Sequence, residues 1–334
     1  MSKDVRQQQL TDWLLAQRGA QCSEPEAIFA DASFRRYFRY QRGRHSEIAM
    51  DAPPEQEDCR PFIAVTEAYA AAGLPVPAIL AQDLELGFMA LQDLGDRHIY
   101  HEFTSAQPAA WYGKALALLP QIAQVQSTAQ GPLPRYDRAL LERELALFPE
   151  WLLGQHLDAL DNAQWQALWP AAAEALIDNA LSQPQCGIHR DYHSRNLMVV
   201  EGAVALIDYQ GALRGPISYD AVSLLRDCYL VLPEAEIERL LAQHVAALKQ
   251  AGVLADSVTL AQFQRWFDLM GIQRHLKAAG IFARLHHRDG RSAYLADLPR
   301  VLNYIITIGA RYPETSALAT FLASAVLPRL EAVR

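Results

Sequence analysis

The stretch Gly187-Ile-His-Arg-Asp-Tyr-His-Ser-Arg-Asn-Leu-Met-Val-Val200 decides the fold of this chain. Asp191 lies in its polar half, Asn196 follows five positions later, and the next apolar run ends at Asp208. A Glu-Gly pair between the two apolar runs predicts a two-residue hairpin turn, which brings Asn196 and Asp208 to one edge. Two carboxylates and a carboxamide in this arrangement suit metal-assisted phosphoryl transfer, because Mg2+ prefers oxygen ligands.

The spacing of this stretch resembles the H-R-D-x-x-x-x-N catalytic loop of protein-kinase-like phosphotransferases, with His189, Arg190 and Asp191 followed by Asn196. Asp191 is then the expected base that orients the attacking hydroxyl, and Asn196 and Asp208 are the expected Mg2+ ligands. The alternative is a polar loop in which Asp191 only caps a helix. The complete pattern of loop, strand, turn, strand and terminal Asp208 favours the phosphotransferase.

Length and composition limit the function classes. With 334 residues, of which 51% are hydrophobic, we expect a soluble globular protein of one or two domains. The net charge of -8 argues against a general nucleic-acid or anionic-membrane binder. The N-terminus has no apolar signal core, and the four cysteines are widely separated, which suits reduced thiols. We therefore expect a cytoplasmic protein with no membrane segment.

The first third of the chain is predicted to form a small sheet with one helix across it. Gly19 and Gly73 end two amphipathic segments, and a Gln-Arg-Gly-Arg turn separates two β-prone runs. The expected helices are 4–17 and 57–72, and the expected strands are 33–40, 47–50, 78–81 and 88–92.

Long alanine- and leucine-rich segments dominate the remainder of the chain. The fold class is therefore α+β, a protein-kinase-like bilobal fold. We predict a nucleotide-binding lobe at 1–92, a hinge at 93–98 and a helical lobe at 99–334, with nucleotide between the lobes. The expected helices are 107–128, 137–153, 162–182, 217–231, 233–250, 259–286 and 317–330, and the only expected strands after the hinge are 196–200 and 203–207.

The N-terminal lobe lacks two features of protein kinases. It has no G-x-G-x-x-G loop, and Met50 stands where the third-strand lysine is expected. Arginine is the natural substitute, because it stays charged and binds phosphate through two nitrogens. We assign phosphate neutralisation to Arg35, Arg39 or Arg44, and Glu67 is a candidate partner for that arginine. Arg35, Arg36 and Arg39 include neighbours that would point to opposite faces of a strand, so at least one is expected to face the nucleotide. The alternative is that these arginines form a solvated basic face. Further expected nucleotide-binding residues are Ser33 and, in the hinge, Asp93.

Several other polar residues have two open interpretations. His193 and Arg195 either contact phosphate or substrate or order the loop. Asp220 either receives the His189 imidazole or caps the following helix. The absence of an A-P-E platform after Asp208 favours a small-molecule substrate over a protein. Candidate substrate contacts are Arg226, Asp227, Arg284, His286, His287 and Arg288.

The chain resembles the aminoglycoside phosphotransferase superfamily over most of its length. Within it, Asp31-Ala-Ser-Phe-Arg-Arg-Tyr-Phe-Arg39, Leu91-Gln-Asp-Leu-Gly-Asp96 and Gly280-Ile-Phe-Ala-Arg-Leu-His-His-Arg-Asp-Gly290 look like the anomeric N-acetylmuramate/N-acetylglucosamine kinases of cell-wall recycling. Met50 at the lysine position is similar to that subgroup. The resemblance implies ATP and Mg2+ as cofactors and an amino sugar as substrate. It also implies a sugar 1-phosphate product that passes to a nucleotidyltransferase for salvage of the UDP-sugar.

Two other functions compete with this one. A kinase for choline-like amino alcohols or aminoglycosides would keep the fold and need an acidic or aromatic pocket, to which Trp266 and its neighbours could contribute. A nucleotide-binding pseudokinase would account for the missing lysine, but Asp191, Asn196 and Asp208 argue against it.

Overall fold

The computed structural model describes residues 5–30, 34–104 and 108–333 of the chain. The chain divides into two compact units. The first contains residues 1–101, 127–132 and 195–211, and the second contains residues 102–126, 133–194 and 212–334. The chain therefore crosses from the second unit to the first between Ser194 and Arg195, inside the stretch Gly187–Val200.

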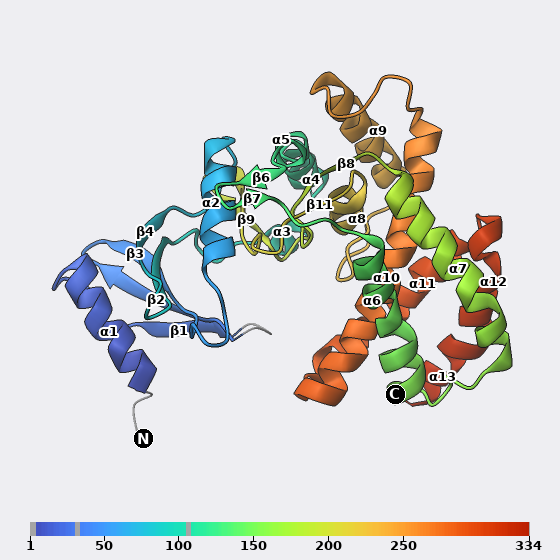
Figure 1. The fold of residues 1–334 in the computed structure, drawn as a ribbon, viewed down its shortest axis with the longest axis horizontal. Helices are drawn as coiled ribbons and strands as arrows, with labels where there is room; N and C mark the ends of the chain where they lie inside the picture. Colours follow the sequence, from blue (N-terminus) through green and yellow to red (C-terminus); the bar gives the residue numbers. More distant parts are fainter. Residues whose placement is uncertain (1–4, 31–33, 105–107, 334) are drawn as a thin grey trace. The chain divides into compact units, whose positions relative to one another are not determined.

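A five-stranded antiparallel sheet of order β1-β2-β3-β5-β4 forms the framework of the first unit (Figure 1). Side chains alternate between the two faces of each strand. One face packs against helix α1 (Val5–Arg18) and buries Phe38, Tyr40, Ala49 and Phe88 with Trp13 of the helix. The strands are β1 (Glu26–Ala30), β2 (Arg36–Arg42), β3 (His45–Asp51), β4 (Ile79–Asp83) and β5 (Phe88–Gln92).

The alternation separates the arginines of β2. Arg36 lies on the α1 face, where its guanidinium and that of Arg6 both bind the fully buried Asp51 carboxylate. Arg39, three residues later, lies on the opposite face together with Met50. Arg36 and Arg39 thus point to opposite faces of β2, and the guanidinium of Arg36 is bound inside the first unit.

The second feature of this unit is a hairpin of β9 (Leu197–Val200) and β10 (Ala203–Leu206). Its turn residues Glu201 and Gly202 have φ of 47° and 82°, the left-handed values that a two-residue hairpin turn needs. Just beyond the hairpin, Tyr209 stacks on Phe62, and its hydroxyl accepts a hydrogen bond from Thr66 Oγ1 at 2.9 Å. Both partners belong to α2 (Arg60–Ala71), so this helix anchors the end of the hairpin.

Helix α10 (Leu260–Asp289) is the centre of the second unit (Figure 1). The Thr259 hydroxyl caps its first turn, and Gly290, with φ of 69°, ends it. Most of the other helices of the unit contact it, which explains why side chains are buried around much of its circumference. The helices of the second unit are α4 (Pro108–Leu116), α5 (Leu119–Gln124), α6 (Arg138–Leu147), the π-helix η1 (Phe148–His156), α7 (Ala163–Ser182), α8 (Tyr219–Leu225), α9 (Glu234–Gln250), the 3-10 helix η2 (Ser292–Asp297), α11 (Leu298–Gly309), α12 (Pro313–Phe321), the π-helix η3 (Leu322–Val326) and α13 (Leu327–Ala332), besides α10 itself.

The structure corrects several predicted elements. The expected helix at 107–128 breaks before Pro120 and ends in β6 (Ser127–Thr128), which pairs with β7 (Gly131–Pro132). The helix expected at 217–231 is only α8, and α11 was not predicted. The expectation of two strands after the hinge is wrong, because β8 (Gln185–Ile188) and β11 (Leu213–Pro216) also pair. Among the described residues, no helix has the length and apolarity to cross a bilayer.

Candidate active site

The edge of the β9–β10 hairpin brings Asn196 and Asp208 together. Asn196 Nδ2 donates to Asp208 Oδ2 at 3.2 Å, and Gln210 Nε2 donates to Asp208 Oδ1 at 2.5 Å. Asp208 has a φ of 64°, a left-handed conformation that aspartate tolerates better than most residues. The carboxylate of Asp208 and the carboxamide oxygen of Asn196 are hard oxygen donors, so this pair fits Mg2+ chemically.

Two buried carboxylates of the second unit fix the loop that carries Asp191. Asp220 accepts the backbone N–H of His189 at 2.7 Å and of Arg190 at 3.0 Å. Asp227 Oδ2 accepts two hydrogen bonds from Ser194, one from the backbone N–H at 3.0 Å and one from the hydroxyl at 2.5 Å. Asp220 thus has the structural role, but it holds the backbone of the loop rather than capping a helix.

Arg190 anchors the loop through its side chain. It has a φ of 78° and donates to Glu144 Oε1 at 2.8 Å, the oxygen that also accepts Lys277 Nζ at 2.7 Å. Burial alone would raise the pKa of Glu144, but the two cations outweigh it and lower that pKa to about 2. Glu144 is therefore a charged, buried junction between the loop, α6 and α10.

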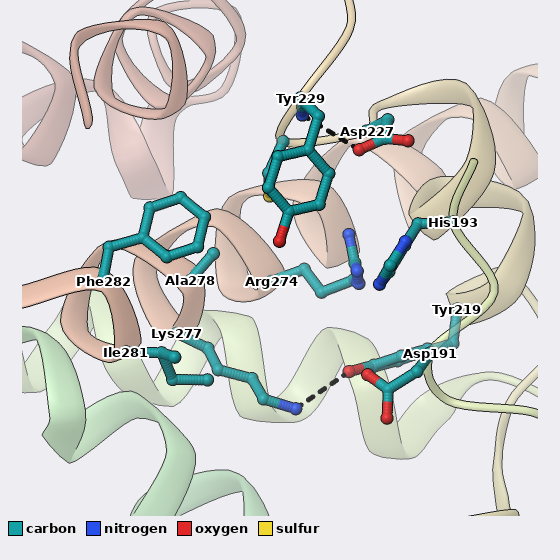
Figure 2. A pocket seen from close by; sticks show the side chains of 11 residues that line it. Asp191, His193, Tyr219, Asp227, Tyr229, Arg274, Lys277, Ala278, Ile281 and Phe282 are labelled. Carbon is teal, nitrogen blue, oxygen red and sulfur yellow. Dashed lines mark hydrogen bonds between the residues drawn. The ribbon is translucent and has the colours of Figure 1, made fainter. Parts of the chain in front are cut away.

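A cavity of about 170 Å³ lies in front of Asp191, entirely within the second unit (Figure 2). One side of it is one face of α10, whose lining residues recur at helical spacing. The opposite side carries Asp191 and His193 of the loop, with Tyr219 of α8. The complete lining is Asp191, His193, Tyr219, Asp227, Cys228, Tyr229, Arg274, Lys277, Ala278, Ile281 and Phe282.

Two cations of α10 face this cavity. Lys277 Nζ lies 3.3 Å from the Tyr219 hydroxyl, and Tyr219 and Glu144 hold the pKa of Lys277 above its ordinary value although burial opposes its charge. Arg274 is 8% exposed, and burial disfavours its charge as well, but Cys228, Tyr219 and Asp191 raise its pKa. Both groups are therefore cationic at neutral pH.

The predicted substrate residues have different positions. His193 lines the cavity, with its ring edge-on to Tyr229 at 5.6 Å between centroids. Asp227 also lines the cavity, but its carboxylate accepts hydrogen bonds from Ser194 of the loop. Arg226 binds Glu234 through two bonds of 2.6 Å and is not among the lining residues. Arg195 belongs to the first unit, where its guanidinium stacks 4.8 Å from the Tyr100 ring centroid.

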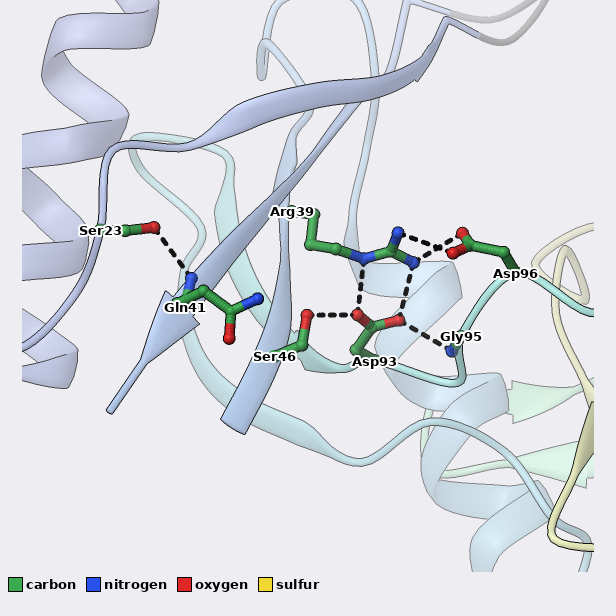
Figure 3. A network of polar contacts seen from close by, with 7 residues as sticks. All are labelled: Ser23, Arg39, Gln41, Ser46, Asp93, Gly95 and Asp96. Carbon is green, nitrogen blue, oxygen red and sulfur yellow. Dashed lines mark hydrogen bonds and ion pairs between the residues drawn. The ribbon is translucent and has the colours of Figure 1, made fainter. Parts of the chain in front are cut away.

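Arg39 and Asp93, both predicted to bind nucleotide, bind each other (Figure 3). The Nε–Oδ2 distance is 2.7 Å, and Asp96 accepts two further bonds from the guanidinium. Asp93 also accepts the Ser46 hydroxyl at 2.5 Å and the Gly95 N–H at 2.8 Å. Burial raises the pKa of Asp93, but Arg39, Ser46 and Gly95 outweigh it, so that the pKa lies below its ordinary value.

Arg35 is the buried arginine at the start of β2. Its Nη2 lies 3.2 Å from Glu57 Oε2, and Asp208 is among the charges that act on it. Glu67, the expected partner, is exposed. Arg44 lies in the exposed turn at the other end of β2, roughly 20 Å away at about 3.3 Å per residue. Met50 is fully buried in the sheet, and Ser33 lies outside the described residues.

A third group of side chains could hold a different kind of metal. Ring nitrogens of His156, His286 and His287 lie within 4.8 Å of one another, and His156 Nδ1 is 3.1 Å from His287 Nε2. Imidazole nitrogens suit zinc rather than magnesium. A hydrogen bond between two neutral rings accounts for the closest of these contacts.

Sequence comparison matches the chain to a family of known chemistry. The model of the phosphotransferase enzyme family matches residues 25–256. The chain belongs to this phosphotransferase family. It is 43% identical to an N-acetylmuramate/N-acetylglucosamine kinase of Pseudomonas aeruginosa, with 97% of this chain and 98% of the relative covered. It is 38% identical to the kinase of the same name from Neisseria meningitidis, with 96% of each covered.

Solved structures place the phosphotransferase in the protein-kinase-like fold, as predicted. It is similar to the choline kinase of Streptococcus pneumoniae, with a TM-score of 0.62 at 12% identity over 90% of this chain and 99% of that one. It is also similar to an ADP-bound aminoglycoside phosphotransferase, with a TM-score of 0.60 at 12% identity over 89% and 97%. At this level of identity the likeness concerns the fold alone.

Arg274 and Lys277 of this phosphotransferase were not among the residues predicted from the sequence. They lie three positions apart on the predicted helix 259–286, and Ala278, Ile281 and Phe282 continue the same face. A pair of cations among small and apolar residues on one helical face was the available signal. It could not be linked to Asp191 without the packing of α10 against α8.

Proposed function

We propose that this phosphotransferase is an ATP- and Mg2+-dependent kinase that phosphorylates the anomeric hydroxyl of N-acetylmuramate and N-acetylglucosamine. The observation that carries the proposal is the match over almost the whole chain to kinases that bear these substrates in their names. The position of Asp191 in the lining of a cavity that has both charged and apolar side chains also supports it. Nucleotide use is supported by the ADP and GDP complexes of related folds.

In this mechanism Asp191 accepts the proton of the anomeric hydroxyl while the oxygen attacks the γ-phosphorus of ATP. The bond between the γ-phosphorus and the β–γ bridging oxygen breaks, and ADP leaves. Asn196 and Asp208 would hold Mg2+, which neutralises phosphate charge when it is bound. Asp220 and Asp227 keep the loop in position through the hydrogen bonds to its backbone and to Ser194.

For the nucleotide phosphates, Arg35 is the best placed of the three predicted arginines. It is buried and interacts electrostatically with Asp208, whereas Arg39 is bound by two aspartates and Arg44 is at the far end of β2. Arg39 and Asp93 would then shape the nucleotide site through their ion pair. Ser33 stays a proposed phosphate contact.

The cavity disfavours a cationic acceptor such as choline or an aminoglycoside. Arg274 and Lys277 face it, and both are charged at neutral pH. A neutral or anionic sugar avoids repulsion from these groups. The sugar 1-phosphate would pass to a nucleotidyltransferase in cytoplasmic salvage of the UDP-sugar.

An acceptor screen with labelled ATP tests this function. The panel contains N-acetylmuramate, N-acetylglucosamine, choline and an aminoglycoside, and phosphorus NMR locates the phosphate on each product. Label on both amino sugars at C1 is the expected result. Transfer to choline or the aminoglycoside alone, or no transfer to any acceptor, would overturn the proposal.

A further inference from the structure

We infer that Arg274, supported by Lys277, is the binding site for the carboxylate of N-acetylmuramate, and that it sets the preference for this sugar over N-acetylglucosamine. The inference rests on the proposed function and adds a subsite to it. The two sugars differ by the lactyl ether, which carries a carboxylate. A protein that binds both can therefore distinguish them through a cation.

The first observation is an unsatisfied donor. The Arg274 side chain is more than nine-tenths buried, yet its Nη1 has no hydrogen-bond partner. Leaving such a buried charged donor unpaired is costly, because it has lost its hydrogen bonds to water. A buried donor of this kind needs an explanation, and a ligand that accepts its hydrogen bond is one. Figure 2 shows the guanidinium directed into the space in front of His193 and Asp191.

The second observation is an excess of positive charge at Glu144. Its single carboxylate is shared by Lys277 and Arg190, so one of the two cations is not neutralised there. Asp227 does not compensate Arg274 through hydrogen bonds, because its oxygens accept from Ser194 and from the Tyr229 N–H. Two cations thus face the cavity from the α10 side, and the carboxylate of Asp191, which lines the same cavity, acts on both.

The third observation is the apolar neighbourhood. Ala278, Ile281 and Phe282 continue the same face of α10 beyond the two cations. A methyl group of the lactyl or acetamido substituent would pack there while the carboxylate reaches Arg274. The anion could instead be the transferred phosphoryl group, since Asp191 lies on the same cavity. The two sources make opposite predictions for N-acetylglucosamine.

The test compares both sugars in the wild type and in Arg274→Gln, with Arg265→Gln as the matched control. Arg265 is also on α10, but it is half-exposed and bound to Glu314. Losing a charge-assisted bond should raise KM for N-acetylmuramate about 10- to 150-fold, or roughly 1.5–3 kcal/mol. KM and kcat for N-acetylglucosamine should change less than about threefold, and Arg265→Gln should change neither.

A second measurement needs no variant and so does not depend on the folding of Arg274→Gln. The wild type is assayed with the methyl ester of N-acetylmuramate, which keeps the lactyl shape and removes the charge. Its KM should exceed that of the free acid about tenfold or more. Equal losses for both sugars in Arg274→Gln, or equal KM for acid and ester, would overturn the subsite while the kinase function stands. Failure of the wild type on both sugars would instead overturn the proposed function.

Discussion

The carboxylate of Asp220 accepts the backbone N–H of His189 at 2.7 Å, thirty-one residues away in the chain. Through this bond and the adjacent one to Arg190, helix α8 fixes the loop that carries Asp191. The Asp220 side chain is buried, and this burial raises the pKa of Asp220 to about 7 despite the two donors. The geometry of the loop and the protonation of Asp220 are therefore linked.

Replacing Asp220 by Asn should make this link measurable. The folded state holds the Asp220 proton more tightly than the unfolded chain between about pH 4 and pH 7, so this stabilising contribution is present at low pH and is lost as the pH rises. Urea unfolding of wild type and Asp220→Asn should show a larger advantage of the wild type at pH 5 than at pH 8. A constant difference would mean that Asp220 titrates normally.

Replacing Glu144 by Gln should destabilise the second unit by roughly 3 kcal/mol, because two cations lose a shared buried carboxylate. The pKa of Glu144 is lowered to about 2, so its contribution is complete above the ordinary pKa and declines as the pH falls toward 2. Urea unfolding should therefore give a smaller difference at pH 4 than at pH 7. Glu142→Gln, an exposed position on the same helix, is the control and should cost less than about 0.5 kcal/mol.

Replacing Gly280 by Ala should destabilise the protein although alanine is the better helix former. A Cβ there would lie 2.4 Å from the backbone carbonyl of Leu147, so α10 and α6 would have to separate. We expect a loss of about 1–3 kcal/mol in thermal unfolding. Gly113→Ala in α4, where a Cβ meets nothing within 4 Å, should instead stabilise by roughly 0.5–1 kcal/mol. The same sign for both substitutions would contradict the packing described here.

Replacing Arg35 by Gln should weaken ATP binding about tenfold, since a charge-assisted phosphate contact is lost. Arg44→Gln is the matched control and should change the affinity less than about twofold. Isothermal titration with a non-hydrolysable ATP analogue measures both. A larger effect at Arg44 would move the phosphate site to the other end of β2.

Local signals explain which parts of the structure followed from the sequence. The β9–β10 hairpin depends on Glu201 and Gly202 and on the apolar runs beside them, all within a few residues. The ladder between β8 and β11 pairs residues from Ile188–Leu213 to Gln185–Pro216, which lie 25 to 31 positions apart in the sequence, and neither four-residue strand has an alternating pattern long enough to be recognised. The π-helix η1 continues α6 through Pro149, where sequence pattern alone indicates one helix.

The candidate site divides in the same way. Asn196 and Asp208 follow from the motif and from the hairpin turn, and the structure brings them within hydrogen-bond distance. The ion pairs of Arg39 with Asp93 and Asp96 join residues more than fifty positions apart in the sequence, so local pattern could not predict them. Arg274 and Lys277 become significant only through packing against Tyr219. The predicted hinge at 93–98 stays a prediction.

The most direct test of the central claim is the turnover of Asp191→Asn with N-acetylglucosamine and ATP. Without a carboxylate to accept the sugar proton, kcat should fall by about 10²- to 10⁴-fold, as for the loss of a general base. Titration with ATP should give an affinity within about twofold of the wild type, which shows that the variant is folded. Unchanged turnover in a variant that binds ATP normally would contradict the account.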